Sequence, residues 1–202
     1  MARTTTVVAN RREQIIDAAM LVFAQKGFDK ATNKDIANQA GITPGLIYHY
    51  FQSKDELLRA AVEQHSPLHV VHPQPADLLK LAPEAFLRFM AHQILTTFEE
   101  EQFIRLLCIF LPEVIHHPDI APLGLTPIHE IAQFVGMYLT SKAEMGELRT
   151  VDSELLAQIL VGSIFGIVLR RQILRDPMAL KYSQEEIIDM VVAMALSHLL
   201  TP

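Results

Sequence analysis

The sequence predicts an all-α protein with a small N-terminal helix-turn-helix domain and a larger C-terminal helical domain. Apolar residues recur at helical spacing in most segments, and no long stretch alternates with the period of two that β-strands show. Capping patterns mark several helix starts, and prolines and glycines separate the helices. A chain of 202 residues is long enough for one or two domains with a sizeable core.

The first of two short neighbouring helices is predicted from Thr32 to Ala40. Thr32 and Asp35 follow the spacing in which a side chain satisfies orphan N–H groups at a helix start. Gly41 ends the helix, because glycine adopts the left-handed cap conformation without a Cβ penalty. The apolar face of this helix is formed by Ile36, Ala37 and Ala40.

The second short helix is predicted to begin after Thr43, which can cap it, with Pro44 in the first turn, where a missing N–H costs nothing. Two short helices joined by a glycine turn form the arrangement that places the second helix in the DNA major groove. A further helix is predicted to begin after the Ser53 cap. A plain helical hairpin shares these caps, but it does not explain the outward surface of the second helix.

That outward surface indicates DNA binding. Ile47 and Phe51 are four residues apart and can face inward, which leaves Leu46 outward, where it suits a thymine methyl group. The adjacent tyrosines and histidine offer donors for phosphates or base edges, although either tyrosine could instead pack inside. The predicted DNA-binding residues are Thr32, Asn33, Lys34, Thr43, Pro44, Gly45, Leu46, Tyr48, His49, Tyr50 and Lys54.

This segment resembles the N-terminal domain of the TetR family of bacterial transcriptional repressors. The first-helix pattern of that family is matched by Arg12, Ile15, Ala18, Ala19, Phe23, Gly27 and Phe28. The following pattern is matched by Thr32, Ile36, Ala37, Ala40, Gly41, Ile42, Thr43, Gly45, Ile47, Tyr48, Tyr50, Phe51, Ser53, Lys54 and Leu57. The match covers residues 11–58, and the variable positions Pro44 and Leu46 bear on which operator is read. The resemblance implies operator DNA and a small-molecule effector as partners.

The charge is divided unevenly along the chain. Residues 1–54 carry seven basic and four acidic residues, whereas the whole chain has a net charge of −6, so the remainder is strongly acidic. The predicted domains are a helix-turn-helix domain at 1–54 and a ligand-binding and dimerisation domain at 55–202. Residues 1–9 are expected to form a mobile arm that either reaches a neighbouring groove or is disordered. The single cysteine, Cys108, rules out an internal disulfide, and no apolar signal core opens the chain. We expect a cytoplasmic protein without a membrane segment.

The C-terminal domain is predicted as a series of helices separated by prolines. Expected helices are 83–99, 100–115 with a kink or end at Pro112, 128–142 after a proline-rich loop, 152–174 and 183–200. The last two helices are apolar nearly all round, which favours burial on several sides. They pair either with their copies in a homodimer, as the resemblance implies, or wholly within one subunit. The predicted dimerisation residues are Leu156, Ile159, Leu160, Gly162, Ile167, Ile188, Val191, Val192, Ala195 and Leu199.

An effector pocket is predicted between the DNA-reading region and these last helices. Aromatic and methionine side chains at helical spacing form either plain core or the lining of a mostly apolar pocket with a few polar anchors. The resemblance implies the pocket, and the lining favours a hydrophobic effector. The predicted pocket residues are Phe86, Phe89, Met90, Gln93, Phe103, Arg105, Leu107, Phe110, Gln133, Phe134, Met137 and Phe165.

Enzymatic and metal-dependent functions are disfavoured. Two histidine clusters are poor zinc sites: the helical spacing of His65, His69 and His72 is interrupted by Pro67 and has no carboxylate on the same turn, and the adjacent His116 and His117, although near Asp119, would point apart on a helix. Cys108 lies in an apolar helix, which favours an inert core thiol. We therefore predict a ligand-responsive homodimeric repressor without metal, cofactor or catalytic residues. The alternatives are a helical ligand-binding or interaction protein without specific DNA binding, and an enzyme on the same scaffold.

Overall fold

The computed structural model describes residues 2–64, 75–116 and 118–200, and all regular elements in this part of the chain are helices. The chain divides into two compact units, Met1–Ser66 with Arg105–Gly124, and Pro67–Ile104 with Leu125–Pro202. This division differs from the predicted boundary at residue 54, because it places the whole fourth helix in the first unit. It also assigns most of the seventh helix to the first unit.

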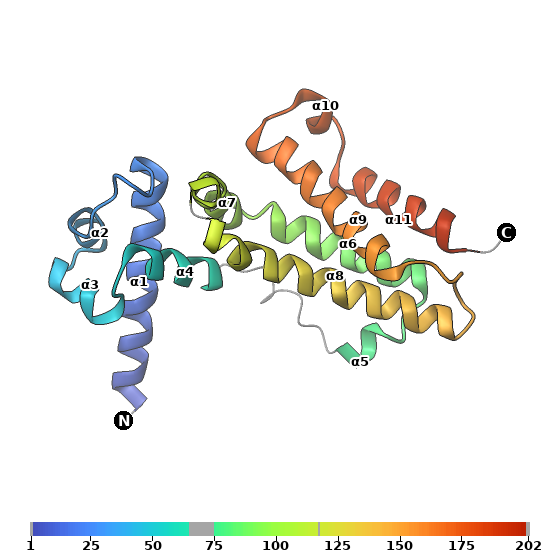
Figure 1. Cartoon of the computed structure of the whole chain (residues 1–202), viewed down its shortest axis with the longest axis horizontal. Coiled ribbons are helices and arrows are strands. Elements are labelled where there is room, and N and C mark those ends of the chain that lie inside the picture. Colours follow the sequence, from blue (N-terminus) through green and yellow to red (C-terminus); the bar gives the residue numbers. More distant parts are fainter. Residues whose placement is uncertain (1, 65–74, 117, 201–202) are drawn as a thin grey trace. The chain divides into compact units, whose positions relative to one another are not determined.

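The first unit is built from α1 (Ala2–Lys26), α2 (Asn33–Ala40), α3 (Pro44–Tyr50) and α4 (Lys54–Gln64), coloured blue to cyan in Figure 1. Helix α1 packs against α2 and α4, and α2 packs against α3. The segment predicted as a mobile arm is helical from Ala2 onward, since no proline or glycine interrupts the chain before Gly27.

The core of the first unit is apolar and receives residues from a distant part of the sequence. Leu57 and Leu58 of α4 are almost fully buried against α1 side chains such as Ile16. Helix α7 (Glu101–His116) and the 3₁₀ turn Pro118–Ile120 add Phe110 and Ile120 to the same core. This burial explains why α4 belongs to the first unit and not to the predicted C-terminal domain.

The second unit contains the long helices α6 (Pro83–Phe98), α9 (Ser153–Val168) and α11 (Gln184–Leu199), with α6 packed against both of the others (Figure 1). Helix α8 (Ala121–Glu144) begins seven residues earlier than predicted. Pro122 is tolerated there because the first helical turn has unpaired N–H groups in any case, and Pro127 lies inside the helix. The short helices α5 (Pro75–Leu78) and α10 (Pro177–Leu180) complete the described elements.

The start of the last two long helices is fixed by capping. The Asp152 carboxylate accepts a hydrogen bond from the Leu155 N–H at 2.9 Å. Ser183 and Glu186 form the predicted capping box at the start of α11. A single α-helix was predicted as far as residue 174. In the structure α9 ends at Val168 and continues as a π-helical segment, Leu169–Ile173, which has a different hydrogen-bond pattern.

Candidate DNA-binding site

Helix α2 is held in place by the predicted capping box. The Thr32 hydroxyl accepts from the Asp35 N–H at 3.2 Å, and the Asp35 carboxylate accepts from the Thr32 N–H at 3.2 Å. The ammonium of Lys26 donates to the same carboxylate at 2.6 Å. Hydrogen bonds from Lys26 and then Thr32 lower the pKa of Asp35 to about 2.

The turn between α2 and α3 is closed by backbone hydrogen bonds around Gly41. Gly41 has a φ of 64°, as the sequence pattern predicts for the left-handed cap, and the N–H of Ile42 donates to the Ala37 carbonyl at 2.9 Å. The Gln14 amide of α1 donates to the Ala40 carbonyl at 2.7 Å, which satisfies one more carbonyl at the helix end. This geometry fixes the direction in which α3 leaves the turn.

Thr43 occupies the cap position of α3, but the predicted side-chain cap is wrong. The N–H of Leu46, which a capping hydroxyl would satisfy, donates to the backbone carbonyl of Thr43 at 3.0 Å. The exposed Thr43 hydroxyl makes no capping hydrogen bond and is left for other partners. Pro44 occupies the first helical turn, as predicted.

Helix α3 presents a polar and aromatic outer surface. Ile47 and Phe51 are each only 1% exposed, so the predicted inward pair is confirmed, whereas Tyr48 is 57% exposed. Leu46 is half-buried. Tyr50 is also half-buried and packs against the core of the first unit, which limits its predicted DNA contact to its exposed part. Asn33 and Lys54 are half-buried. The other predicted DNA-binding residues are exposed, namely Thr32, Lys34, Thr43, Pro44, Gly45 and His49.

Lys54 has a structural role that was not predicted from the sequence. Its ammonium donates to the carbonyl oxygens of Phe28 and Asp29 at 2.8 and 3.1 Å, and it lies 4.8 Å from the centre of the Phe28 ring. These contacts join the start of α4 to the turn after α1. An ammonium has three N–H groups, so one remains for the predicted phosphate contact.

Four of the twelve predicted pocket residues take part in ring–ring contacts. Phe86 stacks on Tyr138 with ring centres 3.5 Å apart, and Phe134 lies 5.9 Å from Phe86. Phe103 stacks on Phe98 at 4.9 Å, and Phe165 meets Phe98 edge-on at 5.6 Å. Burial raises the pKa of Tyr138 to about 12, and its hydroxyl donates to the Leu81 carbonyl at 2.7 Å.

The other predicted pocket residues are spread over different surroundings. Arg105, Leu107 and Phe110 belong to the first unit, whereas the other predicted pocket residues belong to the second. Gln133 and Met137 line an open groove on the outer side of α8, which also contradicts their assignment to an interior lining. Phe89 and Gln93 are half-buried on α6.

A small apolar cavity lies inside the second unit. Its volume is about 20 Å³, enough for about one water molecule but far below the several hundred Å³ of a typical ligand pocket. Of the predicted pocket residues, Met90 alone is part of its lining. The lining comprises Leu87, Met90, Ala91, Ile94, Val135, Leu160, Val161, Ile164, Val191, Val192 and Ala195.

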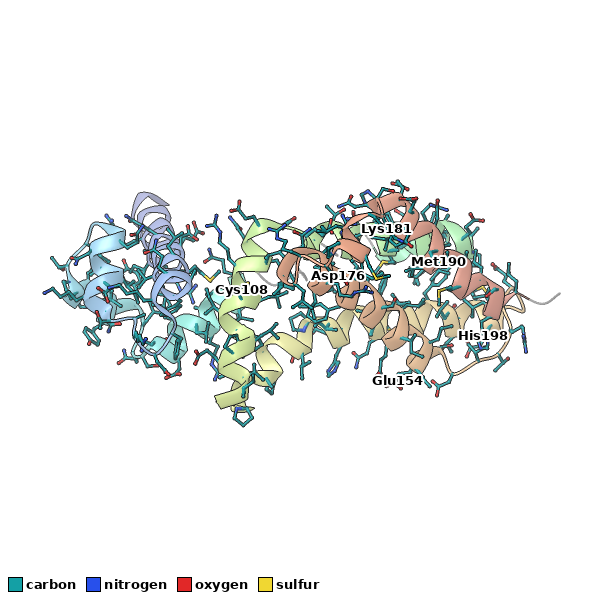
Figure 2. The ribbon with its side chains drawn as sticks, turned by 90° about the horizontal axis from the view of Figure 1, so that it is seen from above. Cys108, Glu154, Asp176, Lys181, Met190 and His198 are labelled. Atoms are coloured by element: carbon teal, nitrogen blue, oxygen red, sulfur yellow. The ribbon has the colours of Figure 1, made fainter. Side chains whose placement is uncertain are left out.

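The structure corrects which face of the last two helices is available to a partner. Five of the predicted dimerisation residues point into their own subunit, at 9% exposure or less, namely Ile188, Val191, Val192, Ala195 and Leu199. Leu156, Leu160 and Ile167 are half-buried, and Gly162 is exposed. Large apolar side chains exposed on α9 and α11 are Leu155, Ile159, Met190 and Met194, at 53%, 56%, 62% and 63% (Figure 2 labels Met190).

The stretch Ser153–Ile173 is long and apolar enough to cross a bilayer by length and composition alone. Its buried residues, including Val161 and Ile164, pack in the core of the second unit. These buried positions make up 33% of the apolar window, and exposed side chains such as Leu155 and Ile159 belong to the rest of the helix.

The described residues contain no group of three or more metal-binding side chains close together. His65, His69, His72 and His117 lie outside the described residues. Cys108 is exposed on α7 (Figure 2), so its prediction as a core thiol is wrong, because the helix turns the neighbouring Leu107 and Ile109 inward instead.

Comparison with known proteins agrees with this arrangement. Residues 15–61 match the model of the bacterial regulatory proteins of the tetR family. The chain is 28% identical over 182 residues to the HTH-type transcriptional repressor BepR of Brucella suis biovar 1, strain 1330, covering 83% of each.

Two solved structures have the same fold. A TetR family transcriptional regulator from Pseudomonas syringae pv. tomato DC3000 aligns with a TM-score of 0.73 at 19% identity, covering 95% of this chain and 97% of its own. FadR from Bacillus subtilis, solved in complex with stearoyl-CoA, aligns with a TM-score of 0.68 at 19% identity, covering 92% of this chain and 98% of its own.

Residues 85–198, more than half of the chain, match the model of the C-terminal domain of AefR-like transcriptional repressors. The chain therefore belongs to the TetR family of transcriptional regulators, a family of DNA-binding proteins and not of enzymes, and it carries an AefR-like C-terminal domain.

Proposed function

We propose that this protein is a cytoplasmic repressor that binds a palindromic operator as a homodimer and is released by a small, mostly hydrophobic effector. The observation that carries the proposal is the outer surface of α3. Thr43, Gly45 and Tyr48 are exposed on a short helix whose inner residues are locked into an apolar core. Such a surface suits base edges and phosphates better than solvent alone.

The homodimer is proposed to form through the exposed apolar faces of α9 and α11. Leu155 and Ile159 of α9, with Met190 and Met194 of α11, are each more than half exposed. Gly162 lies on the exposed side of α9 and allows a close approach of backbones. Two copies of this helix pair would bury these side chains in a four-helix interface and supply two reading heads for a symmetric operator.

The effector is proposed to bind in the second unit by enlarging the apolar cavity. Its lining consists of aliphatic side chains and one methionine, which favours an apolar ligand. The stearoyl-CoA complex of the similarly folded FadR supports an acyl-sized apolar body. The coupling is a population shift, in which the effector binds better to a dimer whose reading heads are wrongly spaced, so operator affinity falls.

A gel shift on the DNA upstream of its own gene tests the DNA-binding part. Wild-type protein should form a sequence-specific complex that weakens steeply with salt, because phosphate contacts release counterions. Leu46→Ala should relax the preference at one base position, whereas exposed Tyr48→Ala should weaken binding evenly across sequences.

A helical ligand-binding protein without specific DNA binding predicts no complex that survives excess unrelated DNA. If Leu46→Ala leaves the sequence preference unchanged, the proposed contact with a thymine methyl group is refuted. Operator affinity that is unchanged at saturating effector would refute the proposed coupling for that effector.

A further inference from the structure

A buried hydroxyl without a partner lies in α6. Thr97 is only 3% exposed, and its Oγ1 atom has no hydrogen-bond partner in the described structure. A buried hydroxyl normally finds a partner, since leaving it unpaired loses its hydration without compensation. Its exposed neighbour Thr96 has no such constraint, because water can satisfy it. The hydroxyl of Thr97 is therefore available to a hydrogen-bonding group from outside the protein.

Thr97 lies on the same side of α6 as the predicted pocket residues. Phe86, Met90, Gln93 and Thr97 follow one another at i, i+4, i+7 and i+11, which places them along one helical stripe. Met90 also lines the cavity of about 20 Å³. Ile94, one turn before Thr97, lines the same cavity. Thr97 thus lies one helical turn along α6 from a residue of the cavity wall.

Aromatic rings continue from this end of the cavity. Phe98 follows Thr97 directly, stacks on Phe103 and meets Phe165 edge-on. Phe165 follows Ile164, which lines the cavity from α9. Met90 is flexible and the three rings are held by contacts with each other, so their rearrangement is a route by which the cavity can enlarge.

The surroundings do not favour a charged ligand. Every residue of the cavity lining is apolar. Glu99, two residues after Thr97, forms a hydrogen-bonded ion pair of 2.7 Å with Arg171, and both side chains are largely buried. Gln184 occupies the second Glu99 oxygen at 2.6 Å. A charged ligand would lose its hydration here without gaining a counter-ion.

We propose that Thr97 is the polar anchor of the effector site, and that the site takes a neutral ligand with an apolar body and one hydrogen-bonding oxygen. This inference rests on the proposed effector response and specifies the ligand class for it. The ligand body displaces Met90 and the Phe98 cluster, and its oxygen exchanges a hydrogen bond with the Thr97 hydroxyl.

Three matched probes test the ligand class by calorimetric titration of the full-length protein. They are 4-butylphenol, butylbenzene, which lacks the hydroxyl, and 4-butylbenzoate, which is an anion. We expect the phenol to bind wild-type protein at least tenfold more tightly than either of the others. Tighter binding of the benzoate, or no binding of the phenol, would overturn the proposal.

Thr97→Val tests the anchor, with Thr96→Val as the matched control. In Thr97→Val the affinities for 4-butylphenol and butylbenzene should converge, while Thr96→Val should retain the tenfold difference. The unliganded Thr97→Val protein should also melt roughly 2–4 °C higher, because it no longer buries an unpaired hydroxyl. A lower melting temperature, or a retained preference for the phenol, would overturn the proposal.

Operator binding separates this inference from the proposed function. Both valine variants should bind operator DNA as the wild type does in the absence of probe. A wild-type protein that fails to bind operator but still distinguishes the probes through Thr97 would refute the repressor function and leave the anchor intact.

Discussion

Replacement of Lys54 by methionine distinguishes its structural role from its predicted phosphate contact. The variant keeps most of the apolar stem but loses hydrogen bonds of 2.8 and 3.1 Å to the carbonyls of Phe28 and Asp29. It also loses the charge that lies 4.8 Å from the Phe28 ring. Because the Lys54 side chain is partly exposed, solvent weakens these contacts, and their loss in the variant should lower the unfolding free energy by about 2 kcal/mol.

Thermal unfolding and salt-dependent DNA binding measure the two roles separately. Lys54→Met should lower the melting temperature by roughly 4–8 °C. Lys34→Met, at an exposed position on α2, should leave the melting temperature nearly unchanged. Each variant should reduce the salt slope of operator binding by about one unit if its ammonium contacts a phosphate. An unchanged melting temperature in Lys54→Met would refute the structural role assigned to this side chain.

Four further substitutions test other parts of the structure. Gly41→Ala should lower the unfolding free energy by about 1 kcal/mol, measured by urea denaturation, because the backbone there has a φ of 64°. Gly124→Ala should also destabilise the protein in urea, since its Cβ would lie 2.4 Å from the Phe110 ring, and a wild-type midpoint would contradict this packing. Asp35 has a pKa lowered to about 2, so its carboxylate stabilises the fold above its ordinary pKa of 3.8 and that contribution is lost as the pH falls through about 2. Asp35→Asn should therefore melt lower at neutral pH and show a shallower loss of stability between pH 4 and 2 by circular dichroism; an unchanged profile would contradict this linkage. Met194→Glu places a charge on the exposed face of α11 and should yield monomers in analytical ultracentrifugation, whereas a stable dimer would contradict the proposed interface.

Local features of the fold were predictable from the sequence because their causes are local. The Thr32–Asp35 box, the Gly41 cap and the Ser183–Glu186 box involve residues within a few positions of one another. The inward pair on α3 was also predictable from helical spacing, since each helix of this unit has one apolar stripe.

Features that depend on distant packing were not predictable in the same way. Helix α4 packs on α1, from which α2 and α3 separate it in the chain, so local spacing alone does not place α4 in the first unit. Lys54 reaches carbonyl groups of a turn more than 20 positions away, a contact without a sequence signal.

For the apolar helices of the second unit, the sequence does not indicate which face is buried within the subunit. Since α11 is apolar nearly all round, periodicity does not distinguish Val192, which is buried in its own subunit, from Met194, which is exposed. The aromatic residues of α6 and α8 have the spacing of a pocket lining and of a core alike, and Phe86 with Tyr138 forms a stacked core pair. Helical spacing places Thr97 on the same stripe of α6 as Phe86, Met90 and Gln93, but its burial without a hydrogen-bond partner depends on packing against other helices.

Selection of bound duplexes from a random DNA pool tests the central claim most directly. The purified protein should enrich sequences with two inverted half-sites whose centres are roughly 34–36 Å apart, one for each α3 of a dimer. Enrichment should be lost in Met194→Glu and altered at one position of each half-site in Leu46→Ala. If wild-type protein enriches no sequence, or if Leu46→Ala enriches the same sequences as the wild type, this account of how α3 reads DNA is contradicted.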